Sequence, residues 1–400
     1  MKDILIVAHF TQTPGEPGNG RFNYLATELS NRGYRVEIVS TKFSHRTKKN
    51  RVESPFESAF KITLLNETGY TRNVSLKRFY SHYSFGINLK KYLKNRKKPD
   101  LIYCAVPSLD AGYVAAQYAK SNNIKFIIDV QDLWPEAFKL VFNTPLISNI
   151  IFSPMKLKAH YIYKNADDII AVSDTYLRRV LEVNNKNIKG SSAYLGTDLQ
   201  YFDDIIVQNP KINKPSNEVW IAYIGTLGHS YNIEAVIDAL KHLKDNCTNN
   251  IKFIVMGDGP LKSRFEDYAK QRNINHIFTG RLQYEEMVTY LRNCDIAVNP
   301  IKKRSAASII NKVGDYAAAG LPVINTQESE EYRGLLEKYE AGLNCQNDNH
   351  IDIAEKIRLL ISNSDLIKRL GKNSRLLAER KFDRRSNYKS IISKIEKYLK

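Results

Sequence analysis

Short apolar runs alternate with amphipathic stretches along the whole 400-residue chain. Apolar runs of about four to eight residues are typical of buried strands, and the stretches between them repeat at about 3.6 residues, the period of a helix. This alternation indicates parallel βαβ units, in which helices cover the faces of a sheet. We interpret as strands residues 4–8, 36–40, 101–106, 125–130 and 169–173 in the first half, and 220–225, 252–256, 276–279, 296–299 and 322–325 in the second.

The length of the chain predicts two domains, because 400 residues exceed what one hydrophobic core usually organises. Asp203–Glu218 is polar and carries two prolines, so we interpret it as a linker. The tail from Asp365 onward is helical in pattern and basic, and we expect it to cross back to the first half.

The spacing of the cysteines and the hydropathy of the sequence indicate the cellular compartment of the protein. The cysteines, which include no C-x-x-C pair, are Cys104, Cys247, Cys294 and Cys345. This spacing argues against a disulfide framework or a zinc site and fits a reducing compartment. The opening apolar run, Ile4–Ala8, is too short for a signal peptide, and no stretch reaches the length of a membrane span. We therefore expect a cytoplasmic protein.

The net charge of +18 is concentrated in residues 42–98, which hold fifteen lysines and arginines against three acids. Aromatic residues are interleaved with these cations. Such a stretch fits contact with an anionic membrane surface, and a solvated helix face with a basic loop is the alternative. No recognisable nucleic-acid module accompanies the charge, so we do not expect nucleic acid as a partner.

The segment N-K-V-G-D-Y-A-A-A-G-L-P-V-I, Asn311–Ile324, predicts a short helix that ends directly before a strand. Its alanines favour helix, Gly320 suits the position after the last helical residue, and Pro322 stops the helix. Lys312 and Asp315 are three residues apart and therefore share one helical face. A cation and a carboxylate are thus held beside a sheet edge; a solvated surface pair is the alternative interpretation.

A glycine-containing turn follows the first strand of each half. T-Q-T-P-G-E-P-G-N-G-R-F places Gly20 ahead of a helix, and I-A-Y-I-G-T-L-G places Gly225 and Thr226 in a second turn. Glycine lets a backbone approach a ligand closely, and the N-terminus of a helix attracts phosphate. Each turn is therefore a candidate phosphate loop, although a plain connection remains the alternative.

The segment I-I-D-V-Q-D-L-W-P-E ends a buried strand with two carboxylates and an indole. Ligands of parallel α/β sheets bind at this carboxyl edge. We expect Asp132 to hold a hydroxyl group, and Asp129 and Trp134 to bind the acceptor beside it. For Asp129 a cap of a turn or helix is the alternative.

The order of G-T-L-G, G-D-G-P, F-T-G-R-L, D-I-A-V-N-P and Asn311–Ile324 resembles family 4 glycosyltransferases of the GT-B fold, above all the branch that builds bacterial capsule, O-antigen and exopolysaccharide. D-L-W-P-E and Y-L-G-T-D-L-Q-Y-F are similar to that branch too. The resemblance implies an α/β chain of two Rossmann-like, doubly wound domains facing a central cleft. They would be an acceptor domain at 1–204 and a nucleotide-sugar domain at 205–383, with a C-terminal helix at 384–400.

The resemblance also implies roles for single residues in donor binding. Asp315 falls where the family has the second acid of a pair, which accepts hydrogen bonds from the ribose. The first acid of the pair would fall at Ala307 and is therefore absent. The family's phosphate-binding Arg and Lys are replaced by Thr226 and Tyr231. We expect Lys312 to supply the missing cation.

Further donor contacts are implied at Gly20 and Arg21, which match the loop that meets the diphosphate, and at Arg281, close to the base. Backbone N–H groups of residues 305–311, including that of Ser308, would add to Lys312. Asp132 falls where relatives often have a histidine near the acceptor and the donor sugar. The expected catalytic residues are therefore Asp132 and Lys312.

The function implied is retaining hexosyl transfer from a nucleotide diphosphate sugar, with UDP as the expected nucleotide, to a lipid-linked saccharide of capsule or lipopolysaccharide synthesis at the inner face of the cell membrane. The expected partners are the nucleotide sugar, the lipid-linked acceptor and the anionic membrane surface. No D-x-D occurs in the sequence, and we expect no metal or other cofactor. The alternatives are a nucleotide-sugar epimerase of the same fold and a non-catalytic nucleotide-sugar-binding partner of another glycosyltransferase.

Overall fold

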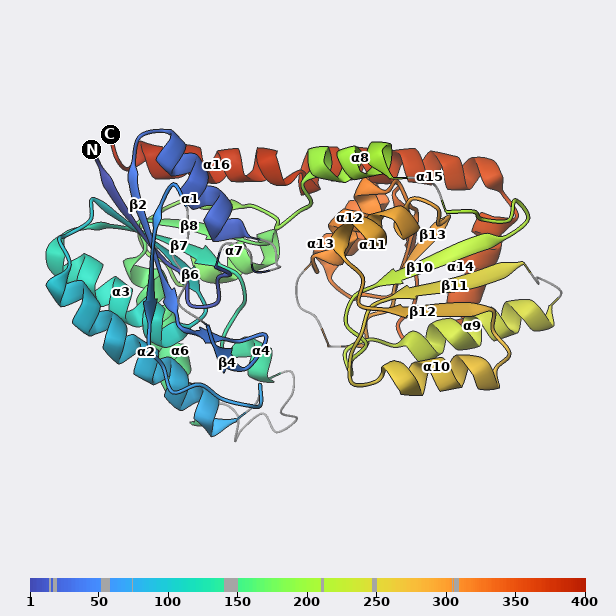
Figure 1. Cartoon of the computed structure of the whole chain (residues 1–400), viewed down its shortest axis with the longest axis horizontal. Helices are drawn as coiled ribbons and strands as arrows, with labels where there is room; N and C mark the ends of the chain where they lie inside the picture. Colours follow the sequence, from blue (N-terminus) through green and yellow to red (C-terminus); the bar gives the residue numbers. More distant parts are fainter. Residues whose placement is uncertain are drawn as a thin grey trace. The chain divides into compact units, whose positions relative to one another are not determined.

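The computed structural model describes residues 1–13, 16, 20–51, 58–73, 75–139, 150–209, 212–246, 250–303, 305 and 309–400. The chain divides into two compact units. The first unit consists of Met1–Leu195 and Tyr388–Lys400, and the second of Gly196–Asn387. Each unit is a parallel sheet covered by helices (Figure 1).

The first unit contains a seven-stranded sheet in the order β5-β2-β1-β6-β7-β8-β9. All of its strands pair in parallel; for example, Ile4 of β1 lies opposite Val36 of β2 and Leu101 of β6. Their bounds are β1 Asp3–Val7, β2 Arg35–Thr41, β5 Lys61–Leu65, β6 Leu101–Val106, β7 Lys125–Val130, β8 Asp168–Ala171 and β9 Ser191–Ser192. A small hairpin of β3 Phe43–Ser44 and β4 Lys49–Asn50 follows β2.

Helices cover both faces of this sheet because side chains alternate along each strand. In β1, Leu5 and Val7 join a core with α2, α3 and α6, whereas Ile4 and Ile6 join a second core with α1 and the C-terminal helix α16 (Figure 1). The helices of the first unit are α1 Arg21–Asn31, α2 Leu76–Asn95, α3 Leu109–Asn122, α4 Glu136–Lys139, α6 Ser153–Asn165, α7 Asp174–Leu181 and most of α16 Arg384–Lys397.

The second unit contains a six-stranded parallel sheet in the order β12-β11-β10-β13-β14-β15. Its strands are β10 Val219–Ile224, β11 Ile251–Met256, β12 His276–Gly280, β13 Ile296–Asn299, β14 Val323–Asn325 and β15 Gly342–Asn344. Its helices are α8 Leu199–Gln208, α9 Ile233–Asp245, α10 Lys262–Gln271, α11 Tyr284–Leu291, α12 Lys312–Ala318, α13 Glu330–Tyr339, α14 His350–Ile361, α15 Ser364–Leu377 and the π-helix η1 Ala378–Phe382.

The parallel α/β architecture predicted from the alternation is confirmed in both units. The interpretation of Asp203–Glu218 as a linker is wrong over its first part, because residues 203–208 belong to α8, which packs on α11. The second unit accordingly begins at Gly196, whereas the sequence placed the boundary between residues 204 and 205. No helix in the described ranges combines the length and apolar character needed to cross a membrane.

Candidate functional site

Two glycine turns interlock at the carboxyl ends of β10 and β11 in the second unit. Gly225 has a φ of 126°, which side-chain-bearing residues rarely adopt. A Cβ on Gly257 would lie 1.8 Å from the Gly225 carbonyl oxygen, and one on Gly259 would lie 2.4 Å from the Leu227 carbonyl oxygen. The backbones of G-T-L-G and G-D-G-P therefore touch directly, and this contact requires glycine at residues 257 and 259.

Lys312 of α12 extends beneath the first of these turns. Its Nζ lies 3.9 and 4.0 Å from the ring centroids of Tyr223 and Tyr231, within the range of cation–π contact. The side chain is buried, and in the described part of the chain Nζ has no hydrogen-bond partner. Burial lowers the pKa of Lys312 well below its usual value. The interpretation of Lys312 and Asp315 as a solvated pair is therefore wrong.

In Asp315, one turn further along α12, one of the two carboxylate oxygens accepts hydrogen bonds from the protein. The hydroxyls of Thr197 and Tyr284 both donate to Oδ1, at 2.7 and 2.9 Å. No hydrogen bond of the described residues reaches Oδ2. Burial raises the pKa of Asp315, and the two hydroxyl hydrogen bonds oppose this rise. One oxygen is thus fixed by the protein, and the other remains for a ligand.

Thr197 is held in place by backbone packing within the second unit. Its N–H donates to the carbonyl of Phe382 at 2.8 Å, and a Cβ on Gly314 would lie 2.9 Å from its Oγ1. Neither Thr197 nor Tyr284 was predicted as a site residue. The motif Y-L-G-T-D-L-Q-Y-F contained Thr197, but nothing in the sequence indicated its contact with Asp315.

Two further residues predicted to bind the donor, Thr226 and Arg281, lie at loops of the second unit. Thr226 is exposed, and its carbonyl accepts a hydrogen bond of 2.7 Å from Tyr223. Arg281 is exposed directly after Gly280, at the carboxyl end of β12. Ser308 lies outside the described residues. The predicted contacts of these three residues with a donor stay predictions.

A chain of asparagine amides at the ends of β13, β14 and β15, buried in the first two strands and half-buried in the third, was not predicted. Asn299 Nδ2 donates to Asn325 Oδ1 at 2.9 Å, and Asn325 Nδ2 donates to Asn344 Oδ1 at 2.9 Å. These bonds tie three strand ends together. They fix the edge from which the chain leaves β13 toward α12. A recurrent Asn at the strand ends, in A-V-N-P, V-I-N and G-L-N, was the available signal.

In the first unit, Arg21 and Asp129 form a buried bidentate pair. Arg21 Nε and Nη2 donate to the two carboxylate oxygens at 2.7 and 3.1 Å, and Nη1 donates to the Ala193 carbonyl at 3.1 Å. Tyr103 and Gln131 also donate to Asp129, each at 2.6 Å. Both groups are thus used inside the protein, which contradicts a diphosphate contact for the Arg21 side chain, and acceptor binding or capping for Asp129. Gly20, with a φ of 66°, positions Arg21 at the start of α1.

Asp132 and Trp134 lie together at the carboxyl end of β7. Asp132 accepts hydrogen bonds from the Leu133 N–H, the Trp134 indole and the Tyr176 hydroxyl, at 2.9, 3.1 and 3.1 Å. Burial raises the pKa of Asp132, and these three hydrogen bonds oppose the rise. The Trp134 ring is buried and stacks on His82 at 5.6 Å. Trp134 therefore forms a wall of the site and offers little surface to a saccharide.

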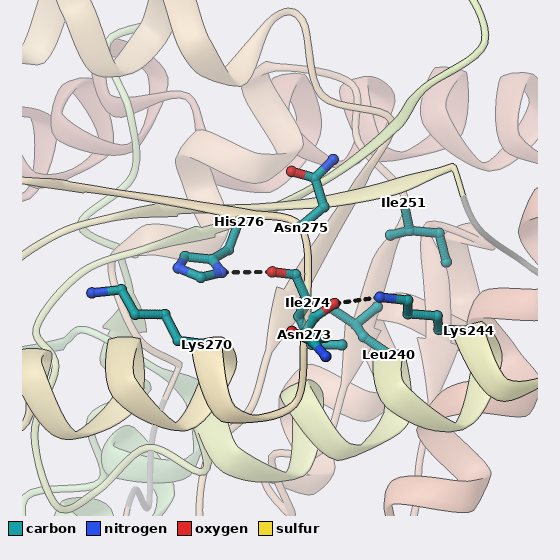
Figure 2. Close-up of a pocket in the computed structure, with 8 residues that line it drawn as sticks. All are labelled: Leu240, Lys244, Ile251, Lys270, Asn273, Ile274, Asn275 and His276. Atoms are coloured by element: carbon teal, nitrogen blue, oxygen red, sulfur yellow. Dashed lines mark hydrogen bonds between the residues drawn. The ribbon is translucent and has the colours of Figure 1, made fainter.

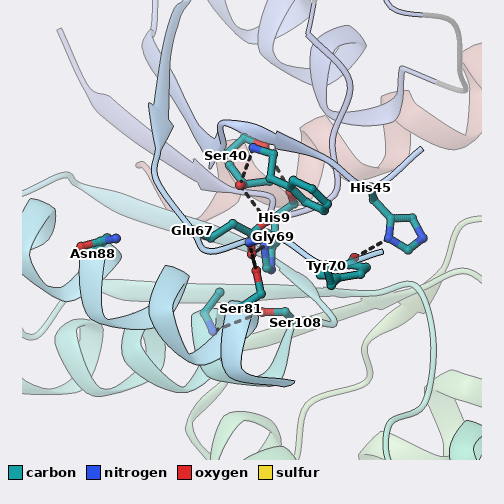
Figure 3. Close-up of polar contacts among 12 residues, drawn as sticks. His9, Ser40, His45, Glu67, Gly69, Tyr70, Ser81, Asn88 and Ser108 are labelled. Atoms are coloured by element: carbon teal, nitrogen blue, oxygen red, sulfur yellow. Dashed lines mark hydrogen bonds and ion pairs between the residues drawn. The ribbon is translucent and has the colours of Figure 1, made fainter. Parts of the chain in front are cut away.

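A buried polar cluster beside this wall contains side chains from several strand ends (Figure 3). His9 Nε2 lies 3.2 Å from Glu67 Oε2, and the hydroxyls of Ser81 and Thr41 each donate to Glu67 at 2.8 Å. Burial alone would raise the pKa of Glu67, but its hydrogen bonds lower it overall. The His9 ring is sandwiched between aromatic rings. His9 and Glu67 were not predicted as site residues, although each lies two residues beyond the end of a strand.

A pocket of about 520 Å³ lies at the opposite, amino edge of the second sheet (Figure 2). Its cations already have partners: Lys244 donates to the Asn273 carbonyl at 2.6 Å, and Lys270 pairs with Glu266 at 3.3 Å. His276 contacts the Ile274 carbonyl at 2.7 Å. None of the residues predicted to bind a ligand lines this pocket, so its size does not make it the functional site.

Solved structures with the same architecture are glycosyltransferases and related synthases. Sucrose-phosphate synthase from Thermosynechococcus elongatus matches with a TM-score of 0.77 at 17% identity, over 100% of this chain and 99% of that one. Anabaena HepE in complex with UDP-glucose matches with a TM-score of 0.67 at 14% identity, over 99% and 100%. The two Rossmann-like units thus have the GT-B fold.

Family models locate the chain within this class. The model described as Glycosyltransferase Family 4 matches residues 21–200, and the model described as Glycosyl transferases group 1 matches residues 204–377. The chain therefore belongs to the family 4 glycosyltransferases of the GT-B fold, as its motifs predicted.

Named relatives agree with this assignment. An uncharacterized glycosyltransferase of Methanocaldococcus jannaschii is 27% identical over 57% of this chain and 60% of its own length. A Campylobacter jejuni α-1,4-N-acetyl-D-galactosaminyltransferase, whose name specifies an undecaprenol-diphosphate-linked saccharide, is 24% identical over 78% and 88%. A putative colanic acid biosynthesis glycosyl transferase of Escherichia coli is 23% identical over 66% of both chains.

Proposed function

We propose that the protein transfers a hexose, with retention, from a UDP-sugar to a lipid-linked saccharide in the synthesis of a bacterial surface polysaccharide. The observation that carries this proposal is the pair of unsatisfied groups on α12. The buried Lys312 amine has no hydrogen-bond partner among the described residues, and Asp315 Oδ2 accepts none from them. A cation and a hydrogen-bond acceptor on one rigid helix match the phosphate and ribose of one nucleotide.

Asp315 is proposed to hold the ribose. Its Oδ1 is oriented by Thr197 and Tyr284, so Oδ2 can accept a hydroxyl hydrogen without loss of an existing bond. A preorganised acceptor of this kind binds more tightly than a freely rotating carboxylate. The UDP and UDP-glucose complexes of Anabaena HepE support the choice of uridine, since both proteins share a fold.

Lys312 is proposed to stabilise the leaving diphosphate. The Lys312 amine lies among aromatic rings, and burial lowers its pKa, so it gives up its proton more readily than an exposed lysine does. An incoming diphosphate would favour the charged form, since an opposite charge nearby raises the pKa of an amine. A cation in such a poorly solvated site acts strongly on charge that develops in the transition state. Lys312 would thereby replace the family cations absent at Thr226 and Tyr231.

Asp132 is proposed to orient the acceptor side of the site. Because three donors already bind its carboxylate, Asp132 is better suited to positioning than to proton abstraction. In a retaining reaction the departing phosphate can take the proton of the acceptor hydroxyl, and the first unit need only align that hydroxyl. No metal ion is required by this scheme.

The lipid-linked acceptor and the membrane location are part of the same proposal. The name of the Campylobacter relative specifies such an acceptor for that protein. Lysines at the C-terminal end of α2 and just beyond it are all exposed and suit an anionic leaflet, and they are Lys90, Lys91, Lys94, Lys97 and Lys98. We place the enzyme at the inner face of the cell membrane, without a membrane-spanning helix of its own in the described residues.

A thermal-shift screen of nucleotide sugars tests the donor assignment, since a ligand at about 100 times its dissociation constant stabilises by about 2.7 kcal/mol. UDP-sugars should raise the melting temperature more than GDP- or ADP-sugars. Transfer from the best donor to lipid-linked saccharides from bacterial membranes should then give a product whose anomeric configuration, read by NMR, is that of the donor. Inversion, or a preference for another nucleotide, would refute the corresponding part of the proposal.

A further inference from the structure

Two cations in the first unit, Arg78 and Lys48, lie together and form no ion pair with any of the described residues. Arg78 of α2 and Lys48 of the β3–β4 turn both lie against the Tyr70 ring, at 5.6 and 4.7 Å from its centroid. Their hydrogen bonds to Asn73 are with neutral groups: Lys48 Nζ donates to the side-chain oxygen at 2.6 Å, and Arg78 Nη1 to the carbonyl at 2.7 Å. In the described ranges Arg78 Nε has no partner, and neither cation forms an ion pair.

Besides burial, the two cations lower the pKa of the neighbouring His45. His45 Nδ1 lies 3.3 Å from Lys48 Nζ and contacts the Tyr70 hydroxyl (Figure 3). Burial, together with Lys48 and Arg78, lowers the pKa of His45 to about 4. Glu67 and Asp132 act on Arg78 from a distance but form no ion pair with it, because Glu67 is bonded to His9 and Asp132 to Trp134 and Tyr176. Among the described residues, Lys48 and Arg78 are therefore two cations that no carboxylate contacts directly.

The start of α2 adds to the same positive field. Helix N-termini favour acidic side chains, because their free N–H groups carry partial positive charge. The first turn of this 20-residue helix has no acid and instead contains Lys77 and Arg78. Departures from such local rules are expected where a ligand supplies the missing charge. An anion at this end of α2 would satisfy the helix and both cations together.

An apolar pocket of about 270 Å³ adjoins the cations. Its apolar lining includes Leu76, Phe79 and Tyr83 of α2, Trp134, Ile151 just before α6 and Met155 within α6. The ion pair of Asp110 and Lys158 also lines the pocket. Trp134 belongs to both features, since the Arg78 guanidinium lies 4.9 Å from its ring. The mouth of the pocket is formed by exposed apolar side chains, with Leu76 86%, Ile151 63% and Tyr83 54% exposed.

We propose that this region binds one lipid phosphate, with its phosphate at Arg78 and Lys48 and the first part of its alkyl or isoprenoid chain in the apolar pocket. The inference rests on the proposed function, because this lipid would be the carrier of the saccharide acceptor. A volume of about 270 Å³ is below the roughly 300–1,000 Å³ of typical ligand pockets, so it suits a length of chain rather than a saccharide. Arg78 and Lys48 are only partly exposed and lie among aromatic rings, so a single phosphate must enter to reach them.

Calorimetric titration of the full chain, without any nucleotide sugar, tests the site with farnesyl phosphate below its micelle concentration. Farnesyl phosphate should bind at least roughly tenfold more tightly than farnesol or inorganic phosphate, because each of these lacks one half of the ligand. Arg78→Met and Lys48→Met should each weaken its binding roughly tenfold or more, the loss of one charge-assisted hydrogen bond. Lys125→Met, an exposed lysine of the same unit at the start of β7, is the matched control and should change nothing.

The pocket is tested by Ile151→Gln, which should weaken farnesyl phosphate and leave inorganic phosphate unchanged. Leu359→Gln, at an exposed leucine of the second unit, is its control. Arg78→Lys keeps the charge and should retain part of the affinity, which separates lost recognition from lost folding. Equal binding of farnesyl phosphate by the parent and Arg78→Met would overturn the phosphate site, and equal binding of farnesol would overturn its role in the lipid.

Vesicles distinguish a single lipid from a bilayer. Binding to phosphatidylglycerol vesicles without any binding of monomeric farnesyl phosphate would overturn the inference, because the partner would then be the membrane surface. Sugar transfer to a soluble saccharide by a protein that does not bind farnesyl phosphate would also overturn it while leaving the catalytic proposal intact. Binding of farnesyl phosphate by a protein that transfers no sugar would support the lipid phosphate site and overturn the catalytic proposal.

Discussion

Lys312 lies so close beneath Gly225 that a Cβ on the glycine would come within 3.0 Å of the lysine Nζ. The absent side chain at residue 225 thus opens the space through which the amine can face a ligand at the turn after β10. Gly225 also adopts a φ of 126°, which residues with a side chain rarely adopt, so the backbone itself favours glycine there. The turn at Gly225 and the side chain of Lys312 therefore pack directly against each other.

Replacing Lys312 by Met should lower turnover more than donor affinity. Methionine fills similar space without charge, and a cation aimed at developing phosphate charge contributes most in the transition state. We expect kcat to fall by about 10²- to 10³-fold, the usual effect of losing one such electrostatic contact. The melting temperature should stay the same or rise, since a buried unpaired amine costs stability.

Steady-state kinetics and UDP titration check this, with Lys338→Met, an exposed lysine of α13, as control. An equal loss in donor affinity and turnover would mean that Lys312 binds the ground state only.

Replacing Asp315 by Ala should weaken UDP binding by about 1.5 to 3 kcal/mol, the range for a hydrogen bond to a charged group. Thr197→Val should have a smaller effect of the same sign, because it removes a hydroxyl that orients the carboxylate. Calorimetry with UDP measures both. If UDP affinity is untouched while the protein melts early, Asp315 is structural and the ribose assignment fails.

UDP binding should also decline with acid at a higher pH than an ordinary aspartate would cause. The ionised carboxylate is the form that accepts a ribose hydrogen bond, and burial raises the pKa of Asp315 in the free protein. As pH falls through that raised pKa, the acceptor is lost. Asp315→Asn cannot titrate there, so its UDP affinity should not change over the same interval. Identical pH profiles for the parent and Asp315→Asn would assign the transition to another group.

The strands of the fold were predictable because most are fully buried and read as continuous apolar runs. The sequence missed β5 and β15, whose residues are mostly only partly buried, and β9, which has two residues. These strands lie at or near sheet edges and rely on pairing with a neighbour, which a local pattern does not reveal.

The site was predictable where its geometry is local. Lys312 and Asp315 share one helix, so their spacing placed them on one side of it. The partners of Asp315 are Thr197 and Tyr284, distant in the chain, and the partner of Arg21 is Asp129 on another strand. The sequence shows that a residue is charged but not whether the folded protein pairs that charge internally. For this reason Arg21 and Asp129 were predicted to contact ligands, although they bind each other.

Activity should survive an excess of EDTA. In the proposed scheme Lys312 neutralises the diphosphate, so no divalent ion is needed at that point. Initial rates with and without EDTA, followed by addition of Mg²⁺ or Mn²⁺, measure the requirement. A strict dependence on either ion would contradict the assignment of this role to Lys312.

Exposed lysines at the C-terminal end of α2 and just beyond it should govern attachment to acidic membranes separately from the lipid phosphate site. The test variant replaces five exposed lysines by Gln at once, and they are Lys90, Lys91, Lys94, Lys97 and Lys98. An anionic leaflet attracts such residues, and the attraction weakens with salt because screening shortens to about 8 Å at physiological ionic strength.

Cosedimentation with vesicles of phosphatidylglycerol should therefore fall at least roughly tenfold in the five-lysine variant, whereas activity on a short soluble acceptor should stay nearly intact. The matched control replaces five exposed lysines of the second unit, which are Lys244, Lys270, Lys338, Lys368 and Lys372. If both variants lose vesicle binding equally, net charge rather than the α2 lysines is responsible. If the α2 variant binds vesicles as the parent does, these lysines form only a solvated helix face.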